Sequence, residues 1–171
     1  MKKFFKLIYQ FFLTIYIFES CKKIEKVSTP GISIFFIKNI NQIKSNSIIK
    51  KYFEKEKFKL NRFKNKSKFI GFKKKGEIIC SGWIYFGNKW NIEEIDKKIF
   101  LKRQYLLYDF ITAKKFRNKG FYQLLLKFIR NKFREKKLMI YSLSHNDKSI
   151  NAIEKSGFIL VKKLKKYQNI I

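Results

Sequence analysis

The feature that most constrains the fold is a regular succession of apolar runs and amphipathic segments in the second half of the chain. Residues 105–112 (YLLYDFIT) are continuously apolar apart from one carboxylate, which is typical of a central strand. A basic turn follows, and residues 120–133 then place apolar side chains on one helical face. The pattern continues as strand, helix and strand, at residues 138–143, 147–156 and 158–164. This order predicts an α/β (α+β) fold in which helices pack on a sheet.

The first half supplies more elements of the same sheet. The patterns predict a strand, a charged helix and the two strands of a hairpin, at residues 31–38, 45–63, 68–73 and 78–86. Ser47 is the candidate N-cap of that helix, and residues 87–102 are expected to form a polar connection. With 171 residues, the whole chain (1–171) is expected to be one domain, with a central mixed, mostly antiparallel sheet and helices on both faces.

Residues 1–18 are a separate question because they are rich in aromatic and aliphatic side chains. Their polar residues recur at helical spacing, at Lys3, Lys6, Gln10 and Thr14. This predicts an N-terminal apolar helix packed on the domain, with an interfacial membrane helix as the alternative. The run is short for a membrane span, and no cleavage site like that of a signal peptide follows it. We expect a cytoplasmic protein, with peripheral contact to the inner membrane face as the alternative.

The formal net charge is +29, from 41 Lys and Arg against 12 Asp and Glu. Such a field attracts nucleic acid, anionic membranes or phosphorylated ligands. The abundance of Lys, Ile, Asn and Phe is also typical of an AT-rich coding sequence, so the charge is weak evidence about partners. Cys21, Cys80 and the single histidine, His145, have no metal-ligand spacing, and we expect neither a metal site nor a disulfide.

The basic turn before the helix at 120–133 is a candidate phosphate site. Unpaired N–H groups at a helix start receive phosphates, and Gly120 lets the backbone approach a bulky anion. Arg117 and Lys119 would add charge-assisted hydrogen bonds of roughly 1.5–3 kcal/mol each, against about 0.3–1 kcal/mol from the helix dipole. An ordinary basic strand-to-helix connection would look the same, and the turn is neither a P-loop nor a dinucleotide fingerprint.

A second polar helix start follows the next strand. Asn146 can cap this helix, and Gly157-Phe158 suits its left-handed exit. Taken together, Arg117-Asn118-Lys119-Gly120-Phe121-Tyr122 and the later Asn146, Ser149 and Gly157-Phe158 resemble the GNAT acetyltransferase superfamily. The acyl-CoA motif of that family is [QR]-x-x-G-x-[GA], and its next motif begins with Asn and ends with Gly-Phe.

The resemblance implies an acyl-CoA-dependent N-acetyltransferase with acetyl-CoA as co-substrate and a small-molecule amine as acceptor. Two central strands would splay apart to admit the pantetheine arm, which would pair with the backbone of Phe110, Ile111 and Thr112. The pyrophosphate would bind the amides of Arg117, Asn118, Lys119, Gly120, Phe121 and Tyr122, and Asn146 and Ser149 would meet the carrier from the other side. A subset of the family with a similar strand and turn acts on sugar amines of surface polysaccharide precursors, which implies an amino sugar as acceptor.

Two positions depart from the family pattern. Tyr122 replaces a small residue, so the turn or the helix start must be altered. Ile153 stands where many members have a tyrosine that protonates the leaving thiolate. A water, Ser149 or Tyr141 would have to serve instead, or the thiolate would leave unassisted.

Attack on a thioester needs a neutral amine, so some group must accept its proton. Asp109 is the candidate base, because it is the only carboxylate in the apolar central strand; the alternative is a core-edge residue paired with Lys or Arg. The acidic cluster of Glu93, Glu94 and Asp96 either borders the acceptor site or forms a solvated patch. His145 is expected at the surface beside the cap.

A different class of function is a basic nucleic-acid-binding module without enzymatic activity. The net charge and the abundance of Phe and Tyr motivate it. No nucleic-acid-binding motif is present, and many of the aromatic residues fall at core periodicity, so the enzyme is the favoured interpretation.

Overall fold

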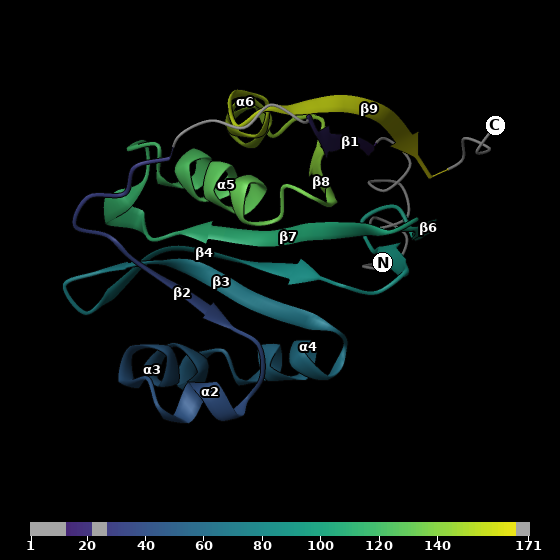
Figure 1. Ribbon diagram of the computed structural model, residues 1–171. Coiled ribbons are helices and arrows are strands. Elements are labelled where there is room, and N and C mark those ends of the chain that lie inside the picture. The colour runs from purple at the N-terminus through teal and green to yellow at the C-terminus, as the bar shows by residue number, and fades with distance from the viewer. Residues whose placement is uncertain (1–12, 22–26, 167–171) are drawn as a thin grey trace, which may run out of the picture.

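The computed structural model describes residues 13–21 and 27–166, and it contains a seven-stranded sheet with the order β2-β3-β4-β7-β8-β1-β9 (Figure 1). Its strands are β1 (Thr14–Ser20), β2 (Ser33–Ile37), β3 (Ser67–Lys74), β4 (Glu77–Tyr85), β7 (Gln104–Thr112), β8 (Lys137–Leu143) and β9 (Phe158–Lys165). Neighbouring strands are antiparallel except β7 and β8, which are parallel. The prediction of a mixed, mostly antiparallel sheet is confirmed.

Helices cover both faces of this sheet, as predicted. On one face lie α5 (Phe121–Lys132) and α6 (Asp147–Lys155). On the other face, below β2 and β3 in Figure 1, lie α2 (Asn41–Lys44), α3 (Ser47–Lys55) and α4 (Asn61–Lys64), with a 3-10 turn at Lys57–Leu60 between the last two. The structure is therefore a mixed α/β single domain.

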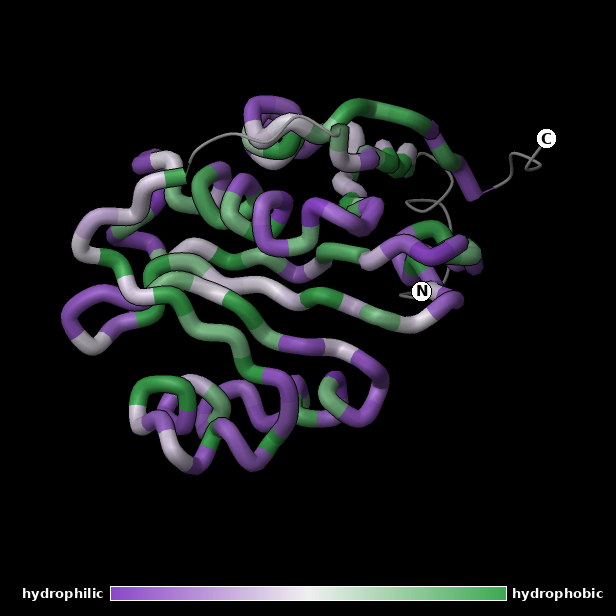
Figure 2. Tube along the Cα trace, in the orientation of Figure 1, coloured by the Kyte–Doolittle hydropathy of each residue, from purple (hydrophilic) through white to green (hydrophobic). Residues whose placement is uncertain are grey.

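Each strand divides its side chains between the two faces, which gives two apolar layers on β3 and β4. Ile70 and Ile84 face α5 and α6, whereas Phe69 and Trp83 face α3. All four side chains are fully buried, and each such burial contributes about 1.5–3 kcal/mol. Figure 2 shows the hydrophobic positions gathered between the helices and the sheet.

The backbone conformation directly after α6 explains why the first residue of the Gly157-Phe158 pair is glycine. Gly157 has a φ of 79°, a left-handed conformation that suits glycine. A Cβ at this position would also lie 2.1 Å from Nη1 of Arg130. The buried Arg130 guanidinium donates hydrogen bonds to the carbonyl oxygens of Ser156 and Cys21, so it joins the end of α6 to the end of β1.

The prediction of a helix over residues 1–18 is wrong for residues 14–18. Thr14–Ser20 form β1, which lies between β8 and β9, and residues 1–12 lie outside the described residues. Ile15 and Ile17 pack on one face of the sheet, whereas Tyr16 and Phe18 pack on the other. Residues 15–18 are apolar at every position because both faces of the strand are covered, so their sequence does not distinguish this strand from a buried helix.

Two smaller predictions are also wrong. The N-cap of α3 is Asn46, whose side chain accepts a hydrogen bond from the Ile49 amide at 3.2 Å, rather than Ser47. Residues 87–102 are not a polar connection but contain a hairpin, β5 (Lys89–Ile92) and β6 (Lys97–Phe100), which buries Ile92 and Ile95 against the main sheet. Within the described part of the chain, no helix is long and apolar enough to cross a membrane.

Candidate active site

The two parallel strands at the centre of the sheet separate part-way along their length. Strands β7 and β8 pair from Gln104 and Lys137 to Leu107 and Ile140. Beyond that point no further pairing joins them in the described residues, although β7 remains paired to β4 as far as Thr112. The second half of β7 therefore presents a strand edge toward the gap.

A bulge in β7 accompanies this separation. Asp109 has a φ of 49°, and the register against β4 shifts so that Asp109 and Phe110 lie opposite Gly82. An extra residue in one strand bends that strand and increases its twist. The bend therefore occurs just beyond Leu107, where β7 leaves β8.

Gly82 is a position that shapes the site through Phe110 and that the sequence-based prediction did not include as a candidate. A Cβ there would lie 2.4 Å from Cδ1 of the Phe110 ring, so only glycine leaves room for this ring. Phe110 in turn lies against Tyr122 at the start of α5, with ring centroids 5.5 Å apart. A glycine inside an otherwise apolar strand marks a bulge or a close approach, and that signal could have identified it.

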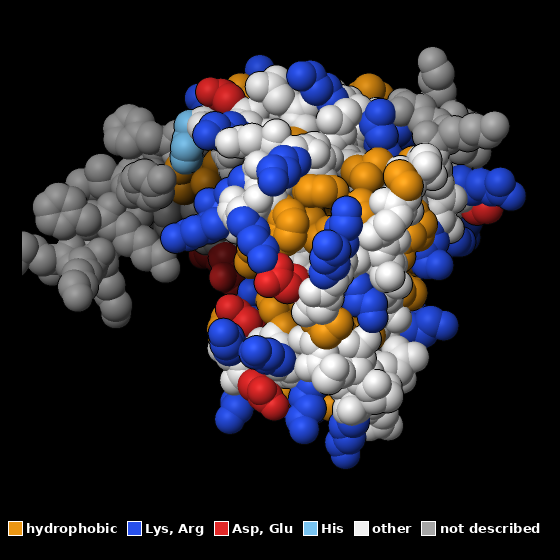
Figure 3. All heavy atoms as spheres, turned by 90° about the vertical axis from the view of Figure 1, so that its left-hand side faces the viewer, with side chains coloured by type: hydrophobic (Ala, Val, Ile, Leu, Met, Phe, Trp, Pro, Cys, Tyr) orange, Lys and Arg blue, Asp and Glu red, His pale blue; other side chains and the backbone are white. Residues whose placement is uncertain are grey.

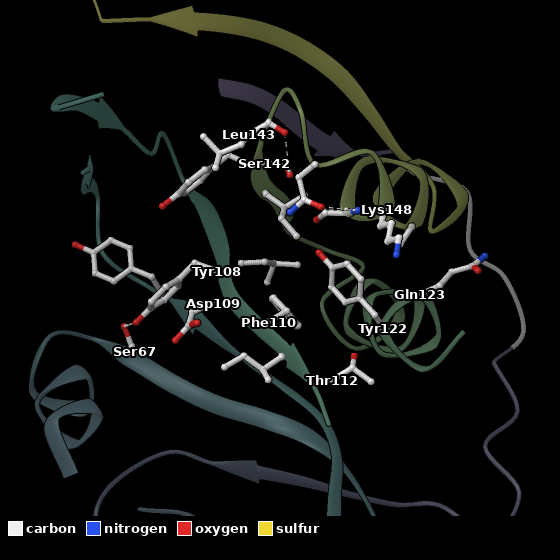
Figure 4. A pocket seen from close by; sticks show the side chains of 18 of the residues that line it. Ser67, Tyr108, Asp109, Phe110, Thr112, Tyr122, Gln123, Ser142, Leu143 and Lys148 are labelled. Atoms are coloured by element: carbon white, nitrogen blue, oxygen red, sulfur yellow. Dashed lines mark hydrogen bonds between the residues drawn. The ribbon is translucent and has the colours of Figure 1, made fainter. Parts of the chain in front are cut away.

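A cleft of about 1700 Å³ opens at the gap between the strands. Side chains from both faces of the sheet line it, including Tyr122 on one face and Trp90 and Tyr141 on the other. Figure 4 shows Tyr108 and Asp109 on one side of this cleft and Tyr122 on the other, with Phe110 between them. The predicted site residues that line it are Asp109, Phe110, Ile111, Thr112, Arg117, Asn118, Gly120, Phe121, Tyr122, Asn146 and Ser149.

Lys119 is the predicted site residue that does not line the cleft. Its side chain is exposed, and its ammonium lies 6.0 Å from the centroid of the Phe116 ring. Arg117 does line the cleft, and its Nε donates a hydrogen bond to the carbonyl of Thr112 at 3.1 Å. Arg117 therefore ties the end of β7 to the turn.

The turn itself has the conformation that an anion site needs. Asn118 and Gly120 have φ values of 60° and 74°, and α5 begins at Phe121 without a side-chain cap. A Cβ on Gly120 would meet no atom within 4 Å. With no side-chain cap on α5, its first N–H groups are candidates to donate hydrogen bonds to a phosphate.

Side chains of α5 and α6 meet across this part of the cleft. The Asn146 side chain caps α6 by accepting a hydrogen bond from the Ser149 amide at 3.2 Å. Burial raises the pKa of the Tyr122 phenol far above its usual value of 10.0, and a hydrogen bond with Ser149 opposes this rise. Ile153 is fully buried, and its aliphatic side chain has no proton to give a leaving thiolate.

Asp109 forms an ion pair, which is the alternative that its sequence position left open. Its Oδ2 lies 2.5 Å from Nη1 of Arg62 and 3.5 Å from Nζ of Lys59. The expectation of a buried, apolar setting inside the strand is wrong, because this side chain lies at the bulge and is 30% exposed. Its role as a base stays a prediction, and two cations already share its negative charge.

The acidic cluster is divided by the hairpin. Glu93 and Glu94 line the cleft together with Trp90, whereas Asp96 is exposed and does not line it. The Trp90 ring centroid lies 4.5 Å from that of Tyr108 and 5.0 Å from that of Tyr85. This wall of the cleft is aromatic and acidic. His145 is exposed, as predicted, beside the capping Asn146.

The family model for GNAT acetyltransferases matches residues 37–158 of the chain. The chain belongs to the GNAT acetyltransferase family. The match includes β7, the turn before α5, and the Asn146 and Gly157-Phe158 motif, and no curated protein matches the chain. Within the described residues, no group of three or more His, Cys, Asp or Glu side chains could hold a metal ion.

Solved GNAT structures share the fold. A GNAT-family acetyltransferase from Novosphingobium aromaticivorans has a TM-score of 0.56 and 11% identity, covering 88% of this chain and 61% of that one. One from Colwellia psychrerythraea has a TM-score of 0.56 and 14% identity, covering 87% and 53%. An aminoglycoside acetyltransferase from an uncultured soil metagenomic sample, in complex with trehalose, has a TM-score of 0.54 and 10% identity, covering 82% and 97%.

This GNAT chain therefore spans 61% and 53% of the length of the first two structures. At such identities the likeness shows the fold alone. The comparisons give no support to the nucleic-acid-binding alternative. Lys and Arg side chains are scattered over the face seen in Figure 3 rather than gathered in one groove.

Proposed function

We propose that this GNAT chain is an acyl-CoA-dependent N-acetyltransferase that moves an acetyl or short acyl group to an amine. The observation that carries the proposal is the separation of β7 from β8 beyond Leu107 and Ile140, beside an uncapped helix start at Gly120. The strand edge can pair with an amide-bearing arm, and the helix start can bind the phosphates of the same carrier.

The parts of the site suit the parts of acetyl-CoA. Amides of residues 117–122 would bind the diphosphate, and Lys148 and Lys155, which also line the cleft, would add positive charge. The backbone of Phe110, Ile111 and Thr112 would pair with the pantetheine amides along the free edge of β7. This route leads the thioester toward the point where the strands separate.

In the transfer, the nitrogen lone pair of the amine attacks the thioester carbonyl carbon, a C–N bond forms, and the C–S bond breaks. The thiolate must then gain a proton. Ser149 and Tyr141 line the cleft, and burial raises the pKa of Tyr141 to about 12, so Tyr141 holds its proton at neutral pH. Tyr141, Ser149 and water are the candidates to donate it.

The acceptor is proposed to be a small-molecule amine, and the motif resemblance favours an amino sugar of a surface polysaccharide precursor. The aminoglycoside acetyltransferase among the similar structures acts on an amino-sugar compound, but its likeness to this chain is one of fold. The cytoplasmic location and the peripheral membrane contact stay predictions.

The test is thermal unfolding of the purified chain with acetyl-CoA and, as the matched control, with S-acetylpantetheine, which lacks the diphosphate. Acetyl-CoA at 100 times its Kd should stabilise the chain by about 2.7 kcal/mol, and the control should stabilise it less at equal concentration. The proposal fails if acetyl-CoA gives no stabilisation. Tight, salt-sensitive DNA or RNA binding in its place would favour the nucleic-acid-binding alternative.

A further inference from the structure

The aromatic and acidic wall of the cleft contains a buried carboxylate oxygen that has no hydrogen-bond partner among the described residues. It is Oε2 of Glu94, an acceptor on the same wall as Trp90. Both residues belong to the segment of β5 and β6, and both line the cleft. Buried polar groups are nearly always paired in native proteins, so an unpaired acceptor on the cleft wall indicates a ligand or a bound water.

The position of this wall relative to the strand separation is informative. Leu107 and Ile140 are the last paired residues of β7 and β8, and Tyr108 and Tyr141 directly follow them. Tyr108 packs on Trp90, and Tyr141 forms a hydrogen bond with the Trp90 side chain. The charge of Glu94 is the largest contribution after burial to the raised pKa of Tyr141. The hairpin wall therefore lies at the apex of the gap, where the thioester would arrive.

The aromatic rings of this wall are held in place by their own contacts. The Tyr85 hydroxyl donates to the Lys89 carbonyl at 2.7 Å, and the Tyr108 hydroxyl donates to Oγ of Ser67 at 2.9 Å. With Trp90 between them, these residues form a fixed apolar surface. Aromatic faces attract organic cations, so the rings and the Glu94 carboxylate favour the same kind of ligand.

Other charged residues also line the cleft and limit what this wall can recognise. Arg62 is neutralised by Asp109, and the Lys89 ammonium lies 5.6 Å from the centroid of the Phe100 ring. Lys64 and Lys66 are exposed, and Glu93 lines the cleft as well. Net charge therefore gives a cation little attraction, and recognition must come from direct contact with Glu94 and the rings.

We propose that Glu94, Trp90 and Tyr141 form the subsite that receives the acceptor as a primary ammonium whose skeleton has an apolar face, and that Glu94 takes its proton. This inference rests on the proposed function. The ammonium gives one proton to the Glu94 carboxylate, and the neutral nitrogen attacks the thioester carbonyl carbon. As the C–N bond forms and the C–S bond breaks, the electron pair of the C–S bond leaves on sulfur. The nitrogen then loses its second proton and the thiolate gains one, through Tyr141, Ser149 or water, which leaves an amide and a thiol.

The chain offers a direct probe because it has only two tryptophans, Trp83 and Trp90. Their indole N–H groups give two signals in a ¹H–¹⁵N spectrum, which Trp90→Phe assigns. Trp83 is fully buried on α3 and serves as the internal reference. The probe is phenethylamine, and its neutral counterpart is 2-phenylethanol.

We expect phenethylamine to shift the Trp90 signal and not the Trp83 signal, and 2-phenylethanol to bind at least tenfold more weakly. Glu94→Gln should weaken phenethylamine binding at least tenfold. Asp96→Asn is the matched control, because Asp96 is an exposed acid in the same hairpin turn and lies outside the cleft lining. It should bind like the unaltered chain.

Turnover gives a second measurement, in which thiol release from acetyl-CoA is followed with phenethylamine as acceptor. Glu94→Gln should lower kcat by roughly 100-fold, since general base catalysis contributes about 10²–10⁴, while acetyl-CoA still stabilises the variant. The inference is overturned by an unresponsive Trp90 signal, by equal binding of the alcohol, or by a Glu94→Gln variant that behaves like the control. If acetyl-CoA stabilises no form of the chain, the proposed function fails instead.

Discussion

The two ends of the cleft differ in the groups that form them: one is mainly backbone and the other mainly side chains. The end near Gly120, where the carrier is proposed to bind, consists of backbone: an unpaired strand edge, a turn with positive φ values and the amides of a helix start. The end near Glu94, where the acceptor is proposed to bind, consists of side chains on a hairpin. A backbone site leaves glycines in the sequence, whereas a side-chain site on a hairpin leaves no such signature.

The ends also differ in charge. Arg117, Lys148 and Lys155 line the carrier end without a neighbouring acid in the lining, whereas two carboxylates, Glu93 and Glu94, line the hairpin wall. A diphosphate and an ammonium would therefore be received at opposite ends of one cleft. Substitutions at one end, with ligand binding measured at both ends, test this difference.

The largest effect is expected from Gly120→Glu, which places a carboxylate where the diphosphate would bind. We expect acetyl-CoA affinity to fall by roughly 100-fold, in line with the ~1.5–3 kcal/mol of a charge-assisted hydrogen bond lost, as measured by calorimetric titration. The matched control is Gly76→Glu in the β3–β4 turn, which has a φ of 79° and equally open space around its Cβ. Equal affinity in the two variants would remove the turn from the site.

Gly82→Ala should affect both ends, because its Cβ would collide with the Phe110 ring between them. Overpacking of this kind costs about 1–3 kcal/mol, which urea unfolding measures. We also expect weaker acetyl-CoA binding, since Phe110 contacts Tyr122 at the carrier end. A variant with unchanged stability and binding would mean that the bulge does not link the two ends.

Asp109→Asn distinguishes between the two candidate bases. The ion pair with Arg62 is partly exposed, since the Asp109 side chain is 30% exposed. Its loss should cost at most about 1 kcal/mol of stability. We expect kcat to change by only a few-fold, far less than in Glu94→Gln. A larger loss of kcat in Asp109→Asn, with the fold intact, would restore Asp109 as the base.

The smallest effect concerns the phenols at the two ends, Tyr122 and Tyr141. Each has a raised pKa in the folded state, so the unfolded chain releases these protons first as pH rises. Their contribution to stability is complete below pH 10, the usual tyrosine pKa, and is lost above it; for Tyr141 the loss runs to about pH 12. Tyr122→Phe and Tyr141→Phe should each lessen this alkaline loss, as measured by urea unfolding at pH 9 and pH 11. If a variant loses as much stability between pH 9 and pH 11 as the unaltered chain does, this expectation is wrong.

Local sequence determined most of the elements and the carrier end. The apolar run at 105–112, the amphipathic face at 121–132 and the glycines at 120 and 157 express preferences that act within a few residues. These local conformational preferences do not depend on which distant segments pack against the element. The order of the elements, the mixed sheet and the start of α5 could therefore be predicted from them.

Long-range contacts decided the remainder. Thr14–Ser20 became a strand because β8 and β9 lie on either side of it, and the hairpin at 89–100 is held by Ile92 and Ile95 against the main sheet. Asp109 lies at a bulge of β7 opposite Gly82, where its side chain pairs with Arg62, 47 residues earlier in the chain. Packing of the hairpin against the main sheet likewise places Glu94 in the lining of the cleft. A side chain's partners depend on which distant segment covers it, and only the tertiary structure contains that information.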